Sequence, residues 1–74
     1  MPNLSILALK TGIEDWEQTL TYEQLQATAF DRGLMHGELL ILQNIKDENI
    51  VSAYHLAVLG LFAELQTRAA KYLH

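Results

Sequence analysis

The sequence predicts an all-α fold: an antiparallel helical hairpin that is preceded by a short helix and assembles into a four-helix bundle. Two observations on composition predict helices. Half of the 74 residues are hydrophobic, and the chain has one proline and four glycines, which are too few breakers for many turns. The third observation is that capping sequences mark three helix starts, with apolar residues at helical spacing after them. We expect residues 1–74 to form a single helical domain.

The first helix is expected to be short. Thr11 and Glu14 fit a capping box, in which the first residue of the box and the residue three places later satisfy each other's backbone amides. This box predicts a helix over residues 12–19. Leu4, Ile6 and Ala8 alternate with their neighbours as in a strand, but the sequence offers no partner strand, so we expect an extended or irregular arm over residues 1–10.

The two arms of the hairpin follow. Thr21 and Gln24 form a second capping box, which begins a helix over residues 22–43. Residues 44–49 are polar and short enough for a turn, and Asp47 or Asn49 then caps a helix over residues 50–73. Because the connection is short, the arms are expected to run antiparallel.

Small residues recur about every four positions on one stripe of each arm, the spacing that lets two helix backbones approach closely. We expect this stripe to face the other arm. The residues predicted to pack closely between the arms are Ala29, Gly33, Gly37, Ala53, Ala57 and Gly60.

Each arm also carries a second apolar stripe, turned away from the first. A hairpin with one short helix cannot enclose both stripes, and an exposed apolar patch marks an interface. The residues predicted to contact a partner are Met35, Leu39, Leu42, Leu56, Leu59 and Ala63.

Four acids gather where the short helix meets the first arm: Glu14, Asp15, Glu17 and Glu23. Acidic side chains in the first turn of a helix are stabilised by the helix dipole, which explains most of them. The alternative is an acidic patch that steers a basic partner or imitates a phosphate backbone.

The charge and the motifs of the sequence argue against several function classes. The net charge is −4 and the five bases are scattered, whereas binding to nucleic acid phosphates needs clustered Lys and Arg. The chain has no cysteine and no catalytic or phosphate-binding motif. We therefore expect no enzyme, no metal and no cofactor. The longest stretch without a charged residue, 49–63, is shorter than the ~20 apolar residues of a membrane span, so no membrane span is expected.

These observations predict a small non-enzymatic interaction module that self-associates as a homodimeric bundle, binds a partner protein, or does both. A cysteine-free domain of this size fits the cytoplasm. One alternative is an adaptor or chaperone that sequesters an amphipathic helix of a partner. The hairpin plan resembles that of the small co-chaperones of type III secretion, and equally that of phage or plasmid proteins that bind a host factor. A weak acidic DNA-associated regulator is the last alternative.

Overall fold

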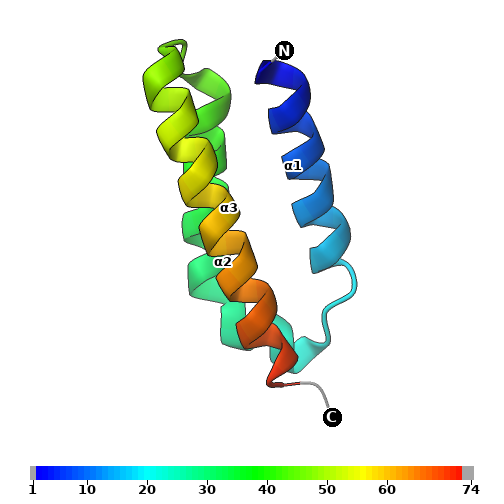
Figure 1. The fold of residues 1–74 in the computed structure, drawn as a ribbon. Helices are drawn as coiled ribbons and strands as arrows, with labels where there is room; N and C mark the ends of the chain where they lie inside the picture. The colour runs from blue at the N-terminus through cyan, green and yellow to red at the C-terminus, as the bar shows by residue number, and fades with distance from the viewer. Residues whose placement is uncertain (1, 73–74) are drawn as a thin grey trace.

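The structure is a computed structural model that describes residues 2–72, with side chains from residue 6 onward. It contains three helices, α1 (Pro2–Glu17), α2 (Tyr22–Asn44) and α3 (Glu48–Ala70), and no strand occurs within 2–72 (Figure 1). The all-α class is therefore confirmed.

Capping chemistry sets the starts of α2 and α3. The amide of Thr21 donates to Oε1 of Gln24 at 2.8 Å, and the amide of Gln24 donates to Oγ1 of Thr21 at 3.2 Å, so the predicted capping box is present. The Asp47 carboxylate accepts from the amides of Asn49 and Ile50 at the start of α3. These side chains satisfy amides that have no partner inside the helix.

The N-terminal segment differs from the prediction. The structure has a single helix from Pro2 to Glu17, so the expected arm over residues 1–10 is wrong over its described part, and the helix does not begin at Thr11. Residue 1 lies outside the described residues. Proline suits the first turn because its fixed φ is helical and its missing amide hydrogen is not needed there. From Ile6 onward the buried side chains follow helical spacing, through Leu9 to Ile13.

The two long helices lie side by side and run in opposite directions, joined by residues 45–47 (Figure 1). The first helix lies along one side of this pair and contacts both members. The molecule measures 42 × 18 × 15 Å.

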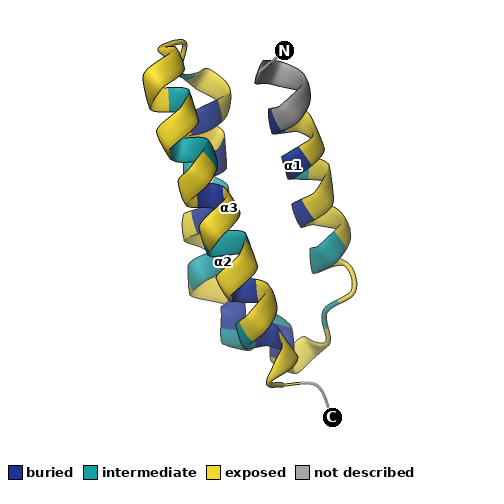
Figure 2. Ribbon diagram, viewed as in Figure 1, coloured by how far each residue is buried: buried dark blue, intermediate teal, exposed yellow. Residues whose placement is uncertain are grey.

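One hydrophobic core lies between the three helices (Figure 2). Its buried apolar residues are Ile6, Leu9, Ile13, Met35, Leu39, Leu42, Val58 and Leu65. At the edge of this core the ring of Trp16 packs edge-on against the ring of Phe62, with 5.4 Å between the centroids. This aromatic contact joins the end of α1 to α3.

Candidate interaction surface

On α2, the predicted interface residues lie inside the protein. Met35, Leu39 and Leu42 are at most 2% exposed and form part of the core, so their assignment to a partner surface is wrong. The physical reason is volume, because the stripe with large side chains fills the space between three helices better than a stripe with two glycines. Gln24 and Thr28 continue this buried face toward the start of the helix.

The opposite stripe of α2 faces outward. Tyr22, Phe30 and Leu40 are 72, 78 and 62% exposed. Gly33 and Gly37 lie among them, and a Cβ added to either would meet nothing within 4 Å. The expected close packing along this stripe is therefore wrong.

On α3 the outcome is mixed. Leu56, Leu59 and Ala63 are exposed, and their role as partner contacts stays a prediction. Ala53, Ala57 and Gly60 were expected to pack against α2, but they are exposed, so this prediction is wrong. Ala29 on α2 is also exposed, and its predicted packing against α3 is wrong for the same reason. The side of α3 that faces the core carries Val58, Leu65 and Ala69.

The two exposed glycines of α2 give a direct test of this correction. We expect Gly33→Ala and Gly37→Ala each to raise the free energy of unfolding by about 0.5–1 kcal/mol, since alanine favours the helix and the added methyl group has free space. Urea unfolding followed by circular dichroism measures the change. Destabilisation by either substitution would show that another backbone lies against these glycines after all.

By length and composition, α3 is apolar enough to cross a membrane. Its most apolar 18-residue window has a mean hydropathy of 1.3, and 11% of that window is buried. The uncharged stretch 49–63 is too short to span a membrane, and the longer apolar window continues past Glu64. Core helices of soluble proteins can be as long and as apolar, but they are mostly buried. The helix α3 differs from them because most of its apolar window is exposed.

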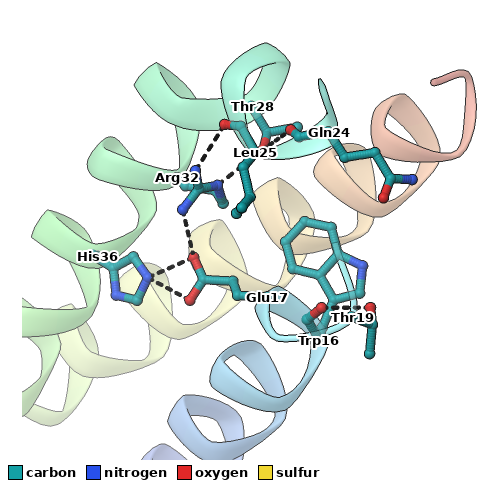
Figure 3. A network of polar contacts seen from close by, with 8 residues as sticks. All are labelled: Trp16, Glu17, Thr19, Gln24, Leu25, Thr28, Arg32 and His36. Carbon is teal, nitrogen blue, oxygen red and sulfur yellow. Dashed lines mark hydrogen bonds and ion pairs between the residues drawn. The ribbon is translucent and has the colours of Figure 1, made fainter. Parts of the chain in front are cut away.

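A polar network holds the end of α1 against α2 (Figure 3). One carboxylate oxygen of Glu17 lies 3.4 Å from Nη1 of Arg32, and both oxygens lie 2.9 Å from Nε2 of His36. The Glu17 side chain is only 15% exposed. Because Arg32 and His36 are four residues apart, they share one face of α2 and can hold the same carboxylate.

The guanidinium of Arg32 is itself fixed from within α2. Its Nε donates to Oγ1 of Thr28 at 2.9 Å, and its Nη2 donates to the carbonyl of Leu25 at 2.8 Å. The hydroxyl of Thr28 donates in turn to the carbonyl of Gln24 at 2.7 Å. With two of its nitrogens engaged on α2, Arg32 presents the third to Glu17, and the network positions α1 (Figure 3).

Two further contacts join α2 to α3. Nε2 of Gln24 donates to the carbonyl of Ala69 at 2.9 Å in the protein interior. The carboxylate of Asp31 pairs with the guanidinium of Arg68. Within the described part of the chain, every buried polar side-chain atom has a hydrogen-bond partner.

The predicted acidic patch is smaller in the structure than in the sequence. Glu14, Asp15 and Glu23 are exposed, whereas Glu17 is engaged by Arg32 and His36. One of the four acids therefore serves to dock α1. The alternative of a basic partner stays a prediction for the other three.

A cleft of about 780 Å³ lies between the start of α1 and the connection of α2 to α3. Its lining mixes apolar and polar side chains, among them Ile6, Leu42, Lys46 and His55. No group of three or more His, Cys, Asp or Glu side chains placed to hold a metal ion occurs among the described residues. The outer apolar surface of α2 and α3 therefore remains the principal candidate site.

Comparison of the chain with protein-family models, with curated proteins and with solved structures finds no match.

Proposed function

We propose that this protein is a non-enzymatic helical module that associates with other protein chains, first of all with itself as a homodimeric bundle. One observation carries the proposal: both long helices expose large apolar side chains after the chain has formed its own core. Phe30 and Leu40 on α2 and Leu56 on α3 are 62–78% exposed. Single exposed leucines are common, whereas exposed apolar rows on two adjacent helices are typical of an interface.

The total surface area supports the same proposal. A compact monomer of this mass has an accessible surface of about 4,600 Å². This chain exposes 5125 Å² at a mass of 8.4 kDa. Covering apolar surface stabilises the protein by about 25 cal/mol per Å², so association of these rows is favourable.

Sedimentation equilibrium tests the proposal. We expect the purified chain to have twice its 8.4 kDa mass at micromolar concentration, and circular dichroism to show helix. A helical chain that stays monomeric throughout the micromolar range contradicts self-association. Binding of an amphipathic helix of another protein is then the version of the proposal to test.

The hydropathy of α3 favours membrane association as a second candidate function. A helix with an exposed apolar face can lie in the interface of a bilayer. Flotation with phosphatidylcholine vesicles tests this. Recovery of the chain with the vesicles would support the membrane candidate, and recovery of a dimer in the unbound fraction would contradict it.

A further inference from the structure

The first helix covers only one side of the α2–α3 pair. At the end of α1, Glu17 contacts Arg32 and His36 of α2, and Trp16 contacts Phe62 of α3. The other side of the pair has no helix of the described chain against it (Figure 1).

The helical period locates the residues of α2 on this uncovered side. Asp31 points to α3, since it pairs with Arg68, and Arg32 lies about 100° from it, toward α1. Around the axis of α2, Leu34 and Ile41 lie about 60° and 80° from Asp31 in the opposite direction, away from α1. They are 50 and 43% exposed.

The same reasoning places the residues of α3, with Arg68 as the reference and Phe62 on the α1 side. Ile50 and Ala57 lie within about 20° of Arg68, and Ala53 and Gly60 lie about 60–80° from it, away from Phe62. All of these residues are exposed. We call the following set the open face: Leu34, Ile41, Ile50, Ala53, Ala57 and Gly60.

The open face has one row of large side chains, on α2, and one row of mostly small side chains, on α3. Its residues on α2 are branched and large, whereas three of its four residues on α3 are alanine or glycine. Because the helices are antiparallel and joined by residues 45–47, Ile41 lies at about the level of Ala53, and Leu34 at about the level of Gly60. Each large side chain therefore has a small residue at its own level on the neighbouring helix.

We propose that the open face binds the open face of a second copy of this chain, with the two-fold axis parallel to the helices. This inference rests on the proposed self-association and names its surface and geometry. A two-fold axis in this direction places α2 of each copy against α3 of the other at the same level. Ile41 then fills the space above Ala53 of the second copy, and Leu34 the space above Gly60.

The area that a stable dimer needs favours a second copy as the occupant. Such dimers bury about 800 Å² on each partner. On a molecule of 42 × 18 × 15 Å, this requires nearly a whole broad side. A single short helix covers too little, whereas a second α2–α3 pair has the matching length and width.

One pair of opposite charges at the end of the open face fits the same arrangement. Glu23 and Lys71 are exposed. Glu23 lies eighteen residues before Ile41, and Lys71 lies eighteen residues after Ala53. Because eighteen residues make five helical turns, Glu23 points in the direction of Ile41, and Lys71 in the direction of Ala53. The two-fold axis brings Glu23 of each copy to Lys71 of the other.

Glu38 and Glu64 lie on the open face itself, about 20° from Asp31 and about 40° from Arg68 around their helices. The two-fold axis sets each of them at the level of the same residue in the second copy, so these like charges weaken the dimer.

Cysteine pairing tests the geometry, since the chain has no cysteine of its own. An Ile41→Cys chain is mixed with a mass-tagged Ala53→Cys chain and oxidised under mild conditions. We expect the mixed disulfide to exceed either symmetric disulfide at least several-fold. An axis across the helices instead pairs α2 with α2, and symmetric Ile41→Cys disulfides in excess would overturn the proposal.

A matched pair of leucine variants tests the surface without oxidation. We expect Leu34→Asp to raise the dimer dissociation constant at least tenfold, whereas Leu7→Asp, at a 57% exposed position of α1, leaves it within about threefold. Circular dichroism verifies that each variant is helical, and the cysteine experiment decides if Leu34→Asp fails to fold. A parent dimer that Leu34→Asp does not weaken overturns this face alone. A monomeric parent overturns the proposed self-association as well.

Discussion

Leu39→Ala is expected to lower the free energy of unfolding by about 2–5 kcal/mol, while Leu40→Ala lowers it by less than about 1 kcal/mol. The two leucines are neighbours in the same helix, and both substitutions replace one good helix former with another. Leu39 is 2% exposed within the core and Leu40 is 62% exposed. The difference between the variants therefore reports burial alone.

Urea denaturation followed by circular dichroism measures both variants. A domain of this length has a total stability at the lower end of the usual range of about 5–15 kcal/mol, so Leu39→Ala is expected to be partly unfolded at room temperature. Equal losses for the two variants, or a larger loss for Leu40→Ala, would show that α2 is rotated and that the stripe with the glycines faces the core.

The second large effect is expected in α1. Ile13 is fully buried, and its replacement by alanine is expected to cost about 2–4 kcal/mol. Leu7→Ala is the control on the same helix, because Leu7 is 57% exposed. Since α1 makes fewer contacts than the other two helices, Ile13→Ala is expected to release α1 before the α2–α3 pair unfolds.

The single tryptophan reports this release directly. Trp16 packs edge-on against Phe62 in the folded chain, so undocking of α1 exposes the indole and shifts its fluorescence to longer wavelength. We expect this shift at a lower urea concentration than the loss of helix in Ile13→Ala, and together with it in Leu7→Ala. Coincident transitions in Ile13→Ala would show that the three helices unfold as one unit.

The starts of the two long helices were predictable because capping is local chemistry. Thr21 and Gln24 satisfy each other across three residues, and Asp47 does the same for the first amides of α3. Such contacts join residues that are close in the sequence, so they can be predicted without knowledge of the tertiary fold. The first ten residues were not predictable in this way, because a short apolar run fits a strand or a buried helix equally well.

The inward stripe of α2 could not be chosen from the sequence either. Leu39 and Leu42 point one way and Leu40 and Ile41 the other, so both stripes are apolar. The choice depends on contacts between helices. Gln24 lies on the inward stripe, and its amide reaches a carbonyl of α3 that no local pattern reveals.

The network around Glu17 was equally hidden, although one signal for it exists. Arg32 and His36 are four residues apart and share one helix face, so an acid docked against that face can contact both. An acid at the end of a preceding helix is the partner that such a pair needs.

The side chain of Gln24 forms hydrogen bonds both at the start of α2 and at the end of α3. Its Oε1 accepts a hydrogen bond from the amide of Thr21 at the start of α2, and its Nε2 donates one to the carbonyl of Ala69 in the last turn of α3. Helix ends ordinarily fray independently of one another. Here the opening of the last turn of α3 frees the group that caps α2, so the amide hydrogens at these two distant points in the sequence are expected to exchange with solvent in a single concerted event.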